Sequence, residues 1–127
     1  MKKTAFFPGK FQPPHIGHVL TISKILKKYN VIIGISPDGP NIISQNEVIN
    51  IFKTIFVNRV EYFIFDNVLS NYKDVNIFPY FDIILTGNIE IINWAKKLKL
   101  PVEKIPRSNC IGGSGTELRR LYKNENK

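Results

Sequence analysis

Short apolar runs that do not alternate with polar residues are the feature that most restricts the fold of this chain. Two of them, residues 4–7 and 31–36, consist almost entirely of apolar side chains, and each is followed by a proline. A strand that is apolar on both faces must be covered on both faces, which is typical of a parallel sheet between layers of helices. The intervening segments carry apolar residues at steps of three and four, as one face of a helix does.

This alternation predicts an α/β fold: a single Rossmann-like doubly wound domain, residues 1–127, with a five-stranded parallel sheet. Ser44 and Glu47 form a predicted capping box at the start of the second helix. For residues 66–80 we predict a loop with at most one short helix before Pro79. We expect strands at residues 4–7, 31–36, 60–65, 83–86 and 102–105, and helices at 17–29, 44–57, 89–99 and 116–123.

In such a fold, all the loops that follow strands lie at one edge of the sheet, and ligands bind where the strand order reverses. The loops predicted to meet there are residues 8–18, 36–43, 86–89 and 106–116. Residues 4–7 end in Pro8-Gly9, which we expect to stop the first strand. The candidate site should therefore begin directly after that strand.

Composition narrows the classes of function. The net charge of +8 favours anionic ligands, although an AT-rich coding bias, which favours lysine, explains it equally well. No nucleic-acid-binding motif is present, so phosphorylated small molecules are the preferred partners and nucleic acid is not expected. No apolar run approaches the ~20 residues of a membrane helix, and no signal-peptide pattern opens the chain. With Cys110 as the single cysteine, these features predict a cytoplasmic protein without a membrane partner.

The loop after the first strand concentrates groups that suit phosphate. Lys10 is cationic, two prolines stiffen the approach to His15, and Gly17 allows close contact with the backbone. His15 and His18 are three residues apart, so both rings can lie on one side of a helix that begins near residue 16. Each ring could donate an N–H to a phosphate oxygen. A metal pair is less favoured, because no third histidine or evident carboxylate completes a ligand set.

A second glycine-rich loop precedes the last predicted helix. Ser114, Gly115 and Thr116 would offer hydroxyls and free amides at a helix N-terminus, where anions bind. Arg119, one turn further along, would add a guanidinium. The alternative interpretation is a flexible linker before a frayed terminal helix. Arg107 could be a binding residue or an ordinary surface residue.

These two loops resemble the two signatures of the HxGH nucleotidyltransferase superfamily. Residues 9–18, Gly-Lys-Phe-Gln-Pro-Pro-His-Ile-Gly-His, are most similar to the archaeal-type nicotinamide mononucleotide adenylyltransferases. Residues 113–120 are similar to the second signature, near the C-terminus. His15-Ile16-Gly17-His18 also matches class I aminoacyl-tRNA synthetases, but 127 residues leave no room for tRNA-binding domains.

The resemblance implies a nucleotidyltransferase that transfers a nucleoside monophosphate from an NTP to a phosphorylated small molecule and releases pyrophosphate, with Mg²⁺ on the phosphates and no dedicated protein metal site. It implies His15, His18, Lys10 and Arg119 as catalytic residues. It further implies that the residues holding the nucleotide are Phe7, Pro8, Gly9, Phe11, Gly17, Ser114, Gly115 and Thr116. Asp38, Asn88 and Arg107 are the candidates for the acceptor.

Some positions depart from the adenylyltransferase pattern. Lys10 stands where arginine is usual, and Ser36-Pro37-Asp38 is similar to small cytidylyltransferases, which use CTP and a phosphorylated alcohol or sugar. That activity is the alternative, and a catalytically silent nucleotide-binding domain is the alternative of another class. Asn88 could contact the acceptor or simply form a turn. A homo-oligomer is possible through the apolar side chains of Val68, Leu69, Tyr72, Ile77 and Phe78.

Overall fold

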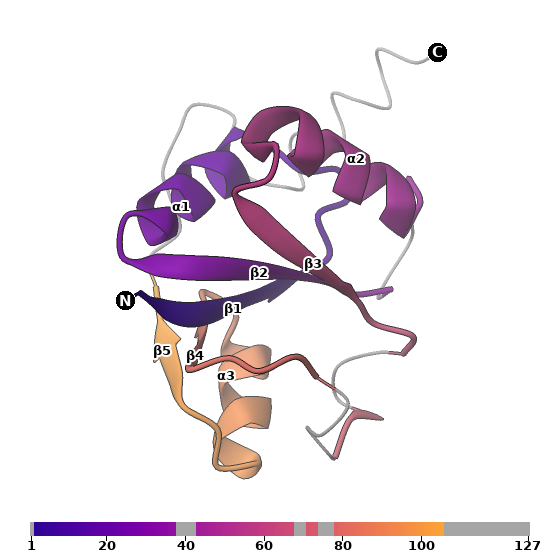
Figure 1. Cartoon of the computed structure of the whole chain (residues 1–127). Coiled ribbons are helices and arrows are strands. Elements are labelled where there is room, and N and C mark those ends of the chain that lie inside the picture. Colours follow the sequence, from indigo (N-terminus) through magenta and orange to yellow (C-terminus); the bar gives the residue numbers. More distant parts are fainter. Residues whose placement is uncertain (1, 38–42, 68–70, 74–77, 106–127) are drawn as a thin grey trace.

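The computed structural model describes residues 2–37, 43–67, 71–73 and 78–105. Its centre is a five-stranded sheet in the order β3-β2-β1-β4-β5, and every neighbouring pair is parallel (Figure 1). The strands are β1 (Lys3–Gly9), β2 (Tyr29–Ile35), β3 (Val60–Ile64), β4 (Ile83–Thr86) and β5 (Val102–Lys104), and the helices are α1 (Ile16–Leu26), α2 (Gln45–Phe56) and α3 (Ile89–Lys97). The predicted α/β class and five-stranded parallel sheet are confirmed.

The chain starts at the central strand β1 and adds strands first on one side of it and then on the other. It runs from β1 through β2 to β3, returns to place β4 on the other side of β1, and then continues to β5. Helices α1 and α2 lie on one side of the sheet and α3 on the other (Figure 1). The strand order therefore reverses between β1 and β4, and the carboxyl ends of these two strands define the switch point.

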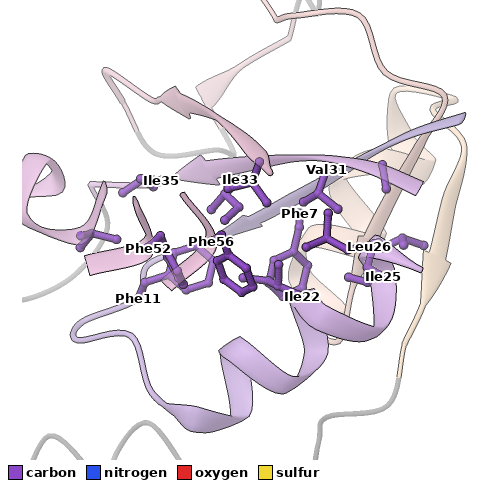
Figure 2. Close-up of a cluster of buried hydrophobic side chains, with 14 residues drawn as sticks. Phe7, Phe11, Ile22, Ile25, Leu26, Val31, Ile33, Ile35, Phe52 and Phe56 are labelled. Atoms are coloured by element: carbon purple, nitrogen blue, oxygen red, sulfur yellow. The ribbon is translucent and has the colours of Figure 1, made fainter. Parts of the chain in front are cut away.

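Two successive phenylalanines of β1 point into the two opposite layers of the core. Phe7 points to the layer of α1 and α2, and Phe6 to the layer of α3, because successive strand residues face opposite sides. The first cluster gathers Ala5, Phe7, Phe11, Ile22, Ile25, Leu26, Val31, Ile33, Ile35, Val48, Phe52, Phe56, Val60 and Leu85 (Figure 2). The second cluster gathers Phe6, Ile32, Phe65, Phe78, Ile84 and Ala95. Burial on both faces explains the continuous apolar runs of the sequence.

The prediction that Pro8-Gly9 stops the first strand is wrong, since β1 continues to Gly9. The Thr4 carbonyl accepts a hydrogen bond from the Asp82 amide, on the side of β4. Pro8, four residues further on, directs its ring nitrogen to the same side, where pairing with β4 ends at Phe6. The missing N–H of the proline therefore removes no sheet hydrogen bond.

Helix α1 ends earlier than predicted. The spacing placed Tyr29 on the helix, whereas α1 ends at Leu26 and Tyr29 begins β2 opposite Lys3. Pairing with β1 thus outweighs the helical spacing of a single side chain. The predicted N-cap of α2 is confirmed, because the Ser44 hydroxyl accepts a hydrogen bond from the Glu47 amide at 3.1 Å.

The described residues of the segment 66–80 form no strand or α-helix. The Tyr72 hydroxyl accepts hydrogen bonds from the amides of Asp66 and Asn67, and Trp94 Nε1 donates to the Tyr72 carbonyl. Phe78 is buried in the second cluster, and Tyr72 packs against it. Two of the side chains suggested for a homo-oligomer interface therefore belong to the core. No helix of the described residues is long and apolar enough to cross a membrane.

Asp82 fastens the start of the central strand, and this makes a pH-dependent contribution to stability. Its carboxylate accepts hydrogen bonds from the Thr4 amide at 2.7 Å and the Tyr80 hydroxyl at 2.8 Å, with Lys3 adding a favourable charge. The Thr4 bond, followed by these others, lowers the pKa of Asp82 below its ordinary 3.8. The contribution is therefore complete above pH 3.8 and is lost as the pH falls through the lowered pKa.

We expect Asp82→Asn to be less stable than the wild type at neutral pH, and the difference to shrink as the pH falls below 3.8. Urea unfolding of both proteins across this range measures the difference directly, because the other titrating groups cancel in the comparison. A difference that stays constant with pH would show that the charge of Asp82 contributes nothing.

Candidate functional site

Two histidines cap the N-terminus of α1, and their rings lie against each other. His15 is the N-cap residue, and its Nδ1 accepts a hydrogen bond from the Gly17 amide at 3.0 Å. The His15 amide in turn donates to Nδ1 of His18 at 3.1 Å, which completes a capping box made of imidazoles. The ring centroids are 3.7 Å apart. The prediction that both rings lie on one side of the helix is confirmed.

This cap determines where each neutral ring carries its proton. Both Nδ1 atoms accept from backbone N–H groups, so neither can hold a hydrogen itself, and the ring proton must be on Nε2. Both side chains are half-buried. The pair therefore supplies two N–H donors in a fixed orientation at a helix N-terminus, an arrangement that suits the oxygens of an anion.

Phe11 supports this pair from the core side. Its ring is buried and meets the His18 ring edge-on at a centroid distance of 4.8 Å. It also contacts Phe52 of α2 at 5.1 Å and Phe7 at 5.9 Å. Phe7 and Phe11 were both predicted to bind nucleotide, but their side chains lie in the first cluster, so only their backbone atoms could contact a ligand. Phe11 has a φ of 53°, which lies in the left-handed region that residues other than glycine rarely adopt.

Gly9 makes room for the Phe11 ring, and this gives a test. A Cβ atom at residue 9 would lie 2.8 Å from Cζ of Phe11. The ring cannot move away freely, because Phe7, Phe52 and His18 surround it. We expect Gly9→Ala to lower the free energy of unfolding by about 1–3 kcal/mol, as overpacking of a core does. Chemical denaturation measures this loss.

The matched control is the double variant Gly9→Ala/Phe11→Leu, in which the shorter side chain removes the colliding atom. Its loss of stability should be smaller than the sum of the two single losses. Strict additivity would mean that the two residues do not compete for this space.

The carboxyl ends of β1, β2 and β4 meet at the edge where the histidines lie. The Ser36 amide donates to the Gly9 carbonyl at 2.9 Å, so the chain beyond β2 stays beside the end of β1. Across the switch point, Thr86 is buried and its hydroxyl accepts from the Asn88 amide. The side-chain Oδ1 of Asn88 accepts from the Glu90 amide at 2.8 Å and caps α3. Asn88 thus forms a turn and a cap, and its contact with the acceptor stays a prediction.

Two glutamines that the sequence did not single out also organise this edge. Gln12 is buried, and its Oε1 accepts a hydrogen bond from the Ile43 amide at 3.0 Å. The side-chain nitrogen of Gln45 donates to the Ile35 carbonyl at 2.9 Å and the Phe65 carbonyl at 3.1 Å. The only sequence signal was a polar residue between Phe11 and two prolines, which does not reveal a partner far along the chain. The Gln12–Pro13 peptide bond is cis.

The remaining predicted site residues are distributed as follows. Pro8 is buried near the end of β1, Gly17 is buried in the first turn of α1, and Lys10 is exposed in the loop between them. Asp38, Arg107, Ser114, Gly115, Thr116 and Arg119 lie outside the described residues, so the second predicted loop stays a prediction. Within the described ranges, no group of three histidine, cysteine or acidic side chains could hold a metal ion.

Most basic residues in the described part of the chain lie away from the histidines. They occupy the opposite edge of the sheet, where strands begin and helices end: Lys2, Lys3, Lys24, Lys27, Lys28, Arg59, Lys96, Lys97 and Lys99. Cations are favourable near helix C-termini, and Lys2 donates to the Leu26 carbonyl at the end of α1. Much of the charge that suggested anionic ligands therefore belongs to helix ends.

Known proteins resemble this chain over nearly its whole length, although no family model matches it. The nicotinamide-nucleotide adenylyltransferase of Sulfurisphaera tokodaii is 27% identical over 96% of this chain and 80% of its own length. Nicotinamide-nucleotide adenylyltransferase 1 of Sulfolobus acidocaldarius is 29% identical over 92% and 76%, respectively. The crystal structure of a Vibrio parahaemolyticus protein assigned as a nicotinate-nucleotide adenylyltransferase has a TM-score of 0.67 at 22% identity, covering 98% of this chain and 89% of that one, which indicates a common fold.

Proposed function

We propose that this chain is a nucleotidyltransferase that adenylylates nicotinamide mononucleotide, using ATP and releasing pyrophosphate. The observation that carries the proposal is the histidine pair, because two Nε2 donors are held side by side at a helix N-terminus beside the switch point. The names of the archaeal relatives, which align over most of both chains, support an adenylyl transfer to a nicotinamide nucleotide.

In the proposed reaction, a phosphate oxygen of the acceptor attacks the α-phosphorus of ATP. A new P–O bond forms as the bond from the α-phosphorus to the bridging oxygen breaks, and pyrophosphate leaves with that oxygen. No covalent enzyme intermediate is needed, so the protein contributes positioning and charge stabilisation. His15 and His18 donate from Nε2 to the oxygens around the α-phosphorus, where negative charge develops.

The second signature, residues 113–120, supplies further groups to this proposal on the basis of the sequence alone. Ser114 and Thr116 offer hydroxyls, and Gly115 an amide, to the β- and γ-phosphates. Arg119 places a guanidinium on the departing pyrophosphate, and Lys10 adds a point charge near the opening loop. Asp38, Asn88 and Arg107 are the candidates that would contact the acceptor.

Mg²⁺ is proposed to bind together with the triphosphate. The Nδ1 atoms of both histidines accept backbone hydrogen bonds, and the described residues form no cluster of three ligands, so the donor set fits an ion held by phosphate oxygens. The ion would neutralise phosphate charge. Chelation with EDTA should abolish turnover, and added Mg²⁺ should restore it.

Pyrophosphate release with a panel of substrates tests the proposal. ATP and CTP are each combined with nicotinamide mononucleotide, nicotinic acid mononucleotide and a phosphorylated alcohol. We expect turnover with ATP and a pyridine mononucleotide, accompanied by the dinucleotide product. Turnover only with CTP and the phosphorylated alcohol would establish the cytidylyltransferase alternative. Nucleotide binding without turnover for any pair would indicate a catalytically silent domain.

A further inference from the structure

We infer that Gln12 is a positioning residue that holds the catalytic histidines by tying their loop to the start of α2. This inference rests on the proposed function, because it concerns the same site. The proposed reaction assigns no role to the Gln12 side chain. Gln12 is nevertheless only 4% exposed, although glutamine residues are usually at the surface.

The partner of the Gln12 side-chain oxygen is a backbone amide from a different loop. Oε1 of Gln12 accepts from the amide of Ile43, the residue before the Ser44 cap of α2. This bond spans 31 positions in the chain and joins two loops that follow different strands. Removing the Gln12 oxygen would leave the part-buried Ile43 amide without this acceptor, so breaking the contact is expected to be unfavourable.

The connection reaches His18 through the neighbouring residue. Phe11 adjoins Gln12, and its ring packs against Phe52 of α2 at a centroid distance of 5.1 Å (Figure 2). The same ring meets the His18 ring at 4.8 Å. The Gln12 hydrogen bond and the Phe11–Phe52 contact therefore fasten adjacent loop residues to the same helix. Moving either residue would move the surface on which His18 rests. Errors of about 1 Å in a catalytic group can cost up to 100-fold in rate.

Gln45 offers a matched comparison. It is also a glutamine whose side-chain amide ties backbone groups at this edge, but its partners are Ile35 and Phe65, at the ends of β2 and β3. The Phe65 ring packs against Phe6, Phe63, Tyr72 and Phe78, whereas the Phe11 ring packs against His18. Losing the Gln45 contacts should therefore affect stability without moving His18.

The experiment compares Gln12→Leu, Gln12→Glu and Gln45→Leu in the intact chain. We expect Gln12→Leu to lower kcat about 10- to 100-fold with a smaller change in KM, since alignment is lost rather than binding. Gln12→Glu keeps an oxygen in place for the Ile43 amide and should recover most of the activity. Gln45→Leu should lose stability and keep kcat within about twofold.

A readout that does not need turnover separates this inference from the proposed function. The chain has two histidines, so the ring-proton NMR signal of His18 is readily assigned, and the Phe11 ring shifts it. We expect that signal to move in Gln12→Leu but not in Gln45→Leu. A wild type without adenylyl transfer would overturn the proposed function alone. An unmoved His18 signal, or an equal loss of kcat in both leucine variants, would overturn the role of Gln12.

Discussion

Replacing His18 with alanine is expected to lower kcat/KM for adenylyl transfer by about 100- to 1000-fold. The variant removes one Nε2 donor from the oxygens that gain charge in the transition state, and losses of this size follow from removing one such donor. Initial rates of pyrophosphate release at varied ATP and acceptor concentrations provide the measurement. A His18→Ala protein with wild-type activity would disprove the proposed mechanism.

The alanine variant also loses the Nδ1 acceptor of the capping box, so two further variants separate the roles of the ring nitrogens. Asparagine places an oxygen near the position of Nδ1 and should keep the hydrogen bond from the His15 amide. Glutamine places an amide N–H near the position of Nε2 and should keep the phosphate donor. We expect His18→Asn to be stable and nearly inactive, and His18→Gln to be less stable with more residual activity.

Phe6→Ala is expected to lower the free energy of unfolding by about 3–5 kcal/mol, as truncation of a fully buried phenylalanine does. Phe6 is fully buried, and its ring contacts Phe63, Phe65, Phe78 and Phe81 at centroid distances of 5.2–6.3 Å. The ring therefore joins β1 and β3 to the chain before β4. Since typical domains are stable by only about 5–15 kcal/mol, such a loss can leave a sizeable unfolded fraction.

Urea unfolding measures the loss, and Phe6→Leu is its control, because leucine refills part of the cavity and should cost less. Adding a side-chain atom beside the Phe6 ring, instead of removing the ring, tests the packing around the same residue. A Cβ atom at Gly34 would lie 2.6 Å from Cζ of Phe6, so Gly34→Ala should also destabilise. If alanine at residue 6 cost no more than leucine, the ring cluster would not be tightly packed.

Much of the fold could be predicted because its signals are local. The apolar runs, the spacing of helical residues and the Ser44 cap each depend on residues that are neighbours in sequence, and β4 matched its predicted range. The predicted ends of β1 and α1 were wrong because residues far away in the sequence determine where these elements end. Pro8 stays in β1 because β4 pairing has already ended, and Tyr29 leaves α1 because Lys3 pairs with it.

For the site, the sequence by itself determined which chemical groups stand at the end of the first strand. His15 and His18, three residues apart at a helix start, were sufficient to place two rings on one side. The tertiary structure decided how these rings are held: which nitrogen carries the proton, which phenylalanine supports His18, and which amide Gln12 accepts. Such details require atoms from separate segments to come within hydrogen-bonding or van der Waals distance. Only packing of the whole sheet and its helices brings them together.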